Sequence, residues 1–546
     1  MKATTVPTDS VRRHVRFAPL LAGLTIVTGA DPAPLAAPQP PTTLVVFVTV
    51  DQMRADYLPR FAAHLTSGLG RLIRGGAWFT DGDLDYANTE TAVGHATVLS
   101  GRFPRHTGIV SNERGVPDSA FPLLEARGPG ASPLRFRGTT LIDWMRVRDP
   151  GARALSVSRK DRAAILPLGR ARGAVFWYAE PDGPFTTSTY YMDTLPTWVR
   201  TFNARRLPQR AAGRAWTLLL PDSAYPEPDS VPFEGGGRDF VFPHLLTADS
   251  ARAAGDVIQY PWMDQITLDF ALAGVEALGL GHGPGTDLLA ISLSSTDAVG
   301  HRYGPDSREI HDQILRLDRA LGAFIDSLYR LRDSARIVIA LTGDHGVGPF
   351  PELYAARTGR PAGHVSLRGP ITEARRALTA QGAPTGAFRI ESNALWVDRA
   401  PLRAAGVAVD SLIAAFVDLA RRVPGVARVD RVAALAGADT LHDTIARRWV
   451  HALPPDLPIE AVVTLEPYWV WGRAADVQHG GPHDYDTHVP VVFYGPSFRP
   501  GRYPDPVRVV DMAPTIAAAI GVTPSGALDG HVLRAALRAA PALDRR

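Results

Sequence analysis

Four continuous apolar runs of strand length stand out along the chain, and three of them lead into an aspartate. They cover residues 44–51, 287–297, 336–345 and 489–494. A run without alternation between apolar and polar positions is typical of a strand that is buried on both faces, as in a parallel sheet between helices. We therefore predict four strands of one central sheet, with Asp51, Asp297 and Asp344 near strand ends.

A long helix is predicted between the second and third of these strands. In residues 307–331 the apolar side chains recur at helical spacing. Strand, helix and strand in this order form a βαβ unit and imply a parallel sheet. The predicted fold class is therefore α/β, with a mostly parallel central sheet flanked by helices. Ligands of such sheets collect at the carboxyl ends of the strands, where the three aspartates are expected to meet.

Two stretches interrupt this pattern, and we interpret both as insertions around the mouth of the site. Residues 170–260 are rich in proline, glycine and aromatic residues, while residues 349–485 contain a helical segment at 407–422 and a strand-like segment at 461–466. Residues 38–546, with both insertions, are expected to form a single catalytic domain.

The first residues have the character of an export signal. Arginines at positions 12, 13 and 16 precede an apolar stretch over residues 17–29, which small residues follow. We predict a signal peptide and the start of a linker over residues 1–37, and a periplasmic or secreted protein. The apolar stretch is short for a membrane span, so no stable span is expected after cleavage. An uncleaved N-terminal anchor is the alternative.

Composition narrows the chemistry further. The net charge is only +3, without a basic run of the kind that binds nucleic acid, so we predict no nucleic-acid partner. The chain has no cysteine, which excludes disulfides and thiolate ligands. A metal site must therefore use histidine, carboxylate and hydroxyl groups, which zinc accepts in catalytic sites.

Two short motifs could supply such ligands. Asp297 and His301 are four residues apart and would share one face of a helix, although a cap with a surface histidine is the alternative. Asp344 and His345 are adjacent, and the glycines that follow would let both side chains reach one ion; a polar turn is the alternative. Asp51 could join them, or could cap a helix.

A candidate nucleophile and a candidate anion clamp lie between these motifs. The hydroxyl of Thr91 is expected at the start of a helix, where the backbone favours an anion, although Thr89 or Thr91 could simply cap that helix. Lys160 and Arg162 form a Lys-x-Arg pair suited to a phosphoryl group. Lys160 is conspicuous because the chain contains only one other lysine, Lys2. A solvated charge cluster is the alternative.

The C-terminal part contains three further candidate ligands. His479, His483 and His488 follow one another in a short stretch, and the spacing alone does not choose among them.

Together these segments resemble the alkaline phosphatase superfamily, most of all its monomeric, phosphate-irrepressible bacterial phosphatases, which have a threonine nucleophile and a Lys-x-Arg pair. The resemblance runs over residues 43–530, with the motifs in family order. It implies two sets of zinc ligands, one of which includes the nucleophile. The first set is Asp51, Thr91, Asp344 and His345, and the second is Asp297, His301 and His488.

The same resemblance implies that Asn112, Lys160 and Arg162 bind the oxygens of the phosphoryl group. It selects His488 among the three histidines because the family ligand directly precedes the Val-Pro strand. One departure is Val93, at a position where many relatives have proline; proline would help to fix the start of the helix.

The predicted function is that of a two-zinc alkaline phosphatase. It would act on small-molecule phosphate monoesters through a phospho-threonine intermediate at Thr91, release inorganic phosphate, and be a monomer. The first alternative is a phosphodiesterase, nucleotide pyrophosphatase or phosphonate hydrolase of the same superfamily. A second alternative is a zinc-binding protein that has lost catalysis. A third is a metal-dependent mutase or transferase, and the threonine and the Lys-Asp-Arg segment argue against this third alternative.

Overall fold

A computed structural model of the chain describes Met1, residues 40–472 and residues 477–538. The predicted signal peptide lies outside these residues except for Met1, so export stays a prediction. Over the described ranges, none of the helices combines the length and the apolar character that crossing a membrane would require.

The centre of the fold is a nine-stranded sheet of order β18-β2-β17-β10-β1-β9-β4-β5-β6. Its five middle strands are parallel, and antiparallel or short strands complete both edges. The middle strands are β10 (Ile337–Gly343), β1 (Leu44–Val50), β9 (Asp287–Leu293), β4 (Ala154–Ser158) and β5 (Ala174–Tyr178). The edge strands are β18 (Gly501–Tyr503), β2 (Ala77–Phe79), β17 (Val491–Tyr494) and β6 (Phe185–Thr186). The predicted α/β class is confirmed.

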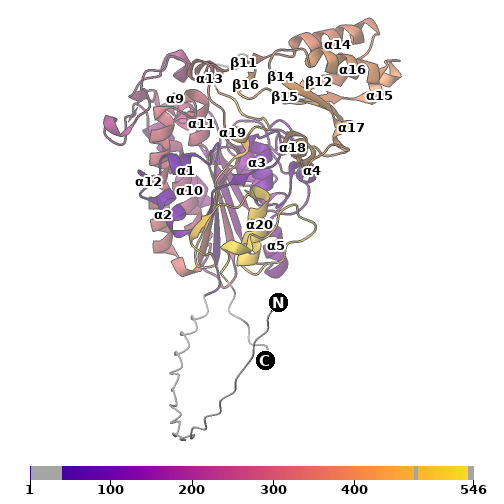
Figure 1. Ribbon diagram of the computed structural model, residues 1–546. Helices are drawn as coiled ribbons and strands as arrows, with labels where there is room; N and C mark the ends of the chain where they lie inside the picture. The colour runs from indigo at the N-terminus through magenta and orange to yellow at the C-terminus, as the bar shows by residue number, and fades with distance from the viewer. Residues whose placement is uncertain (2–39, 473–476, 539–546) are drawn as a thin grey trace. The chain divides into compact units, whose positions relative to one another are not determined.

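Helices cover both faces of this sheet (Figure 1). One face carries α2 (Gly68–Gly75), α10 (Trp262–Ala277) and α12 (Arg308–Leu331), and the other carries α3 (Thr91–Val98), α5 (Leu141–Arg148) and α20 (Met512–Ala519). Strand β1 alternates between the two cores: Phe47 packs into the core around α3, while Val46 and Val48 pack into the opposite one. Because each face is apolar, a strand without polar alternation is stable here.

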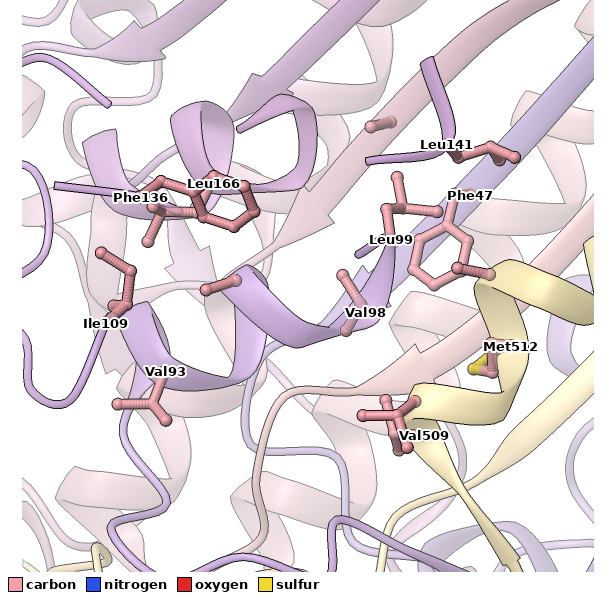
Figure 2. Close-up of a cluster of buried hydrophobic side chains, with 14 of the residues drawn as sticks. Phe47, Val93, Val98, Leu99, Ile109, Phe136, Leu141, Leu166, Val509 and Met512 are labelled. Carbon is pink, nitrogen blue, oxygen red and sulfur yellow. The ribbon is translucent and has the colours of Figure 1, made fainter. Parts of the chain in front are cut away.

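The core beneath α3 fixes the helix that begins at Thr91. Val93 and Val98 of this helix lie among the buried side chains around Phe47, Leu166 and Met512 (Figure 2). This packing positions the helix although proline is absent at residue 93.

The two predicted insertions differ from each other in the structure. Strands β5 and β6 belong to the central sheet, so the first part of the predicted insertion at 170–260 is part of the core. The second stretch contains a separate antiparallel sheet of order β12-β13-β15-β14, which we call the insertion sheet. Its strands are β12 (Phe388–Glu391), β13 (Ala394–Val397), β15 (Ile459–Leu465) and β14 (Val426–Arg431), with α14 (Arg368–Ala380) and α16 (Val409–Ala420) packed on it.

Candidate functional site

The carboxyl ends of β1 and β10 bring three polar side chains together. Asp51 directly follows β1, and Asp344 and His345 directly follow β10; all three are fully buried. Nε2 of His345 lies 3.4 Å from Oδ1 of Asp51. We call these three residues the strand half-site.

Several buried atoms of the strand half-site are incompletely satisfied. Among the described residues, Oδ1 of Asp51, Oδ2 of Asp344 and Nε2 of His345 have no hydrogen-bond partner, and Oδ2 of Asp51 faces only the ammonium group of Lys160. Burying such groups costs free energy unless a cation compensates them. The donor set, two carboxylates and an imidazole, fits a divalent cation such as zinc.

A second group of ligand atoms lies beside the first. Asp297 and His301 share one face of α11 (Ser295–Tyr303), with Nε2 of His301 3.3 Å from Oδ1 of Asp297. Nε2 of His479 lies 3.9 Å from the same oxygen, and these three residues could hold one ion. We call them the helix half-site. The His345 and His479 rings stack at 3.6 Å between centroids, so the two half-sites are contiguous.

The three histidines of the cluster share one orientation. Nδ1 donates to a backbone carbonyl in each: His301 to Val477 at 2.7 Å, His345 to Gly346 at 3.0 Å and His479 to Thr89 at 2.7 Å. A carbonyl only accepts, so the proton is on Nδ1 and the lone pair of Nε2 faces the carboxylates. This is the usual arrangement of a metal-ligating histidine.

The structure does not bring His488 to this cluster, so that prediction is corrected. Its side chain is 43% exposed, and its Nε2 lies 3.3 Å from Asp83 and 3.5 Å from Asp81. The short helix α19 (Asp484–Thr487) separates it from the site. His479 reaches the site instead, because the glycines after it let the chain turn back, and Thr89 Oγ1 donates to Gly481 O at 3.0 Å.

The cluster carries more negative than positive charge. Burial, reinforced by Asp297 and Asp344, raises the pKa of Asp51 to about 6, and burial lowers the pKa of His345 to about 4. Lys160 lies between the half-sites, with Nζ 2.6 Å from Oδ2 of Asp51 and 2.7 Å from Oδ2 of Asp297. Burial opposes the charged form of Asp297, but Lys160 and His301 lower its pKa well below the usual value.

Thr91 begins helix α3 and is almost completely buried. Glu90 holds the N-cap position, without a side-chain cap bond, so Thr91 is not the cap. Nζ of Lys160 donates to Oγ1 of Thr91 at 3.3 Å. The candidate nucleophile thus lies where the anion-binding end of a helix meets an ammonium group.

The other predicted phosphoryl-binding residues lie around the same helix start. Oδ1 of Asn112 accepts from the backbone N–H of Ala92 at 2.9 Å, which leaves its Nδ2 group available as a donor. Arg162 lies on α6 (Asp161–Ile165), which packs beside α3. Its buried Nε has no partner among the residues that the structure describes.

One residue that the sequence analysis missed connects the two half-sites. Gln52 has a left-handed backbone (φ 63°) and is fully buried. Its backbone N–H donates to Oδ1 of Asp344 at 3.0 Å, and its Nε2 donates to Oδ1 of Asp297 at 3.2 Å. Its only signal in the sequence is that it directly follows Asp51.

Comparison with known proteins gives consistent matches. The sequence model of the family described as type I phosphodiesterase / nucleotide pyrophosphatase matches residues 45–405. The chain is 31% identical over 505 residues to alkaline phosphatase PhoV of Synechococcus elongatus, covering 89% of this chain and 91% of PhoV. It is 30% identical over 499 residues to a protein of Myroides odoratus named calcium-transporting ATPase, covering 87% and 91%.

Among solved structures, the crystal structure of wild-type alkaline phosphatase PafA is similar over most of the chain. The TM-score is 0.85 at 26% sequence identity, and the match covers 91% of this chain and 99% of PafA.

Proposed function

Because the chain belongs to the type I phosphodiesterase / nucleotide pyrophosphatase family of the alkaline phosphatase superfamily, we propose that it is a metal-dependent phosphomonoesterase. Its substrates would be small phosphate esters, and its product inorganic phosphate. The observation that supports this proposal is that Lys160 donates to Oγ1 of Thr91 and Asn112 bonds to the start of the same helix, beside the histidine and carboxylate atoms of the two half-sites.

We propose two zinc ions as the cofactor. One would be held by the strand half-site together with Thr91, and the other by the helix half-site, with His479 in place of His488. When bound, such a pair supplies Lewis acidity for both the attacking and the leaving oxygen of an in-line displacement. Imidazole and carboxylate ligands suit zinc, and the absence of cysteine in the chain removes thiolate competition.

Thr91 would be the nucleophile of the first step. Its Oγ1 would give up its proton and attack phosphorus, and the bond from phosphorus to the leaving-group oxygen would break. The leaving group would take up a proton and depart as an alcohol, with the phosphoryl group attached to Thr91. Water then hydrolyses this phospho-threonine and restores the hydroxyl. The buried, preformed helix start fixes the position of Oγ1, so little reorganisation is needed during the reaction.

Lys160, Arg162 and Asn112 would bind the non-bridging oxygens of the phosphoryl group. Fixed donors that face developing charge in a buried site are the main protein contribution to phosphoryl transfer. A monoester presents a dianion, whereas a diester presents one negative charge and a second group that must be housed. Two cationic side chains and an amide therefore favour the monoester.

Comparing kcat/KM for p-nitrophenyl phosphate and bis-p-nitrophenyl phosphate, each with and without added zinc, tests the proposal. We expect the monoester to be preferred by at least about tenfold, a difference of roughly 1.4 kcal/mol in transition-state stabilisation. Equal rates or a preference for the diester would indicate a phosphodiesterase instead. A periplasmic or secreted location and a monomeric state stay predictions that fractionation and light scattering would check.

A further inference from the structure

A hairpin of the insertion sheet reaches the segments that carry the active-site residues. Strands β12 and β13 pair antiparallel and are joined by Ser392 and Asn393, with Ser392 in a left-handed conformation (φ 51°). We call Glu391, Ser392 and Asn393 the hairpin tip. Each of its three side chains bonds to a segment that holds a proposed active-site residue.

Asn393 uses every polar atom of its side chain in this contact. Its Nδ2 group donates to Oδ1 of Asn88 at 2.9 Å and to the backbone carbonyl of Gly480 at 2.6 Å. Its Oδ1 accepts from Nε1 of Trp471. The side chain is almost fully buried, so water does not replace these bonds easily.

The two partners of this amide group belong to the nucleophile segment and to the histidine loop. Asn88 lies three residues before Thr91, and Gly480 directly follows His479. The same two segments meet where Nδ1 of His479 donates to Thr89 O. Asn393 thus connects the proposed nucleophile and a proposed metal ligand that are far apart in the sequence.

The other two residues of the hairpin tip fasten the loop of Asn112. Oγ of Ser392 donates to Oε1 of Glu90 at 2.6 Å, and Oε2 of Glu90 accepts from the backbone N–H of Asn112 at 2.7 Å. Glu391 forms a two-pronged ion pair with Arg114, at 2.6 and 3.0 Å. The tip therefore bonds to the segments that carry Thr91, Asn112 and His479.

We propose that Asn393 is a positioning residue, which holds His479 in place beside Asp297 and His301 of the helix half-site and fixes its position relative to the Thr91 segment. The insertion sheet would then help to position the residues of the catalytic centre. His479 stands on a loop and has no strand or helix to hold it, so its place depends on bonds of this kind. Outer partners of metal ligands typically contribute roughly 10- to 100-fold to metal affinity or activity. The inference rests on the proposed two-zinc function.

The variant Asn393→Asp tests this role. Aspartate keeps the shape of the side chain and the acceptor for Trp471, but it has no N–H donor. One of its carboxylate oxygens would therefore lie against the oxygen atoms of Asn88 and Gly480 that the amide group now bonds. We expect zinc affinity to fall by roughly 10- to 100-fold at one of the two sites, measured by titrating metal-free protein in competition with a chelator. We expect the other site to retain its affinity and kcat to fall with the weakened site. A merely structural role would lower Tm and leave the ratio of the two affinities unchanged.

Asn203→Asp is the matched control. The amide of Asn203 donates to the backbone carbonyl of Phe185 at 2.9 Å, remote from the site, so its loss should change neither zinc affinity. If Asn393→Asp does not fold, Trp471→Phe removes the indole donor to Asn393 while keeping an aromatic ring, and it should weaken the same zinc site by a smaller factor. Wild-type affinities in whichever of the two variants folds would overturn the proposal.

A failure of the proposed phosphatase function would give results that differ from a failure of the proposed role of Asn393. Wild-type protein that binds two zinc ions but hydrolyses no phosphate ester would refute the phosphatase, while the titration would still decide the role of Asn393. Wild-type protein that binds no zinc at the second site would refute both.

Discussion

The strand half-site and the helix half-site are built on different supports. Asp51, Asp344 and His345 follow neighbouring central strands directly and are completely buried. In the helix half-site, the side chains of His301 and His479 are 29% and 9% exposed, and His479 stands on a loop. A central sheet is among the last parts of a fold to open, whereas a loop is held only by its individual bonds. The strand half-site is therefore preformed by the fold, whereas the helix half-site is complete only when individual bonds hold His479 beside α11.

This difference has a direct consequence for metal binding. A fully preformed set of ligands loses less conformational freedom when it binds an ion than a set in which one ligand stands on a loop. We therefore expect the strand half-site to bind its ion more tightly and to be emptied last by a chelator.

The largest effect is expected from Thr91→Ala, which removes the group that both half-sites serve. Turnover should fall by about four orders of magnitude or more, since loss of a nucleophile removes the covalent route. Both half-sites should still bind zinc, because their histidines and carboxylates are unchanged. Single-turnover assays and metal analysis of the purified variant would check this. Substantial residual activity would show that Thr91 is not the nucleophile.

The next largest effect distinguishes between His479 and His488, which lie in the same short stretch of the chain. His479→Ala should lower kcat/KM by roughly 100-fold and reduce bound zinc from two ions to one, because the helix half-site loses a ligand. His488→Ala should stay within about twofold of wild type, because its imidazole faces Asp81 and Asp83 at the surface. Metal content and kcat/KM of the two variants, measured side by side, decide the assignment. The reverse result would restore the sequence-based choice.

The same contrast explains what could be predicted from the sequence. Continuous apolar runs predicted β1, β9 and β10 to within a few residues, because burial on both faces leaves a pattern in the chain itself. Edge strands β2 and β18 have only three residues each and carry no such pattern. The hydrophobic periodicity likewise predicted α12.

The candidate site divides in the same way. Asp51 and the Asp344–His345 pair follow strands and were therefore visible as strand-end residues. Two bonds set the place of His479: its own bond to Thr89, 390 residues away, and the bond of the neighbouring Gly480 to Asn393, 87 residues away. No local pattern records such bonds, so the spacing left three histidines open, and the resemblance to the family selected His488 instead of His479. The hairpin tip was missed for the same reason.

The smallest effect is expected at Gln52, where a substitution can lower the zinc affinity of one half-site and not the other without removing any metal ligand. Gln52→Met keeps the length of the side chain and the backbone N–H that bonds to Asp344, but it loses the Nε2 donor to Asp297. Zinc affinity should therefore fall by roughly tenfold at the helix half-site and stay unchanged at the strand half-site. Gln265→Met removes a similar amide-to-carboxylate bond, to Asp269 on the same helix, and should change neither affinity. Equal weakening of both sites by Gln52→Met would show that they form one cooperative unit, and the distinction between a preformed and a dependent half-site would fail.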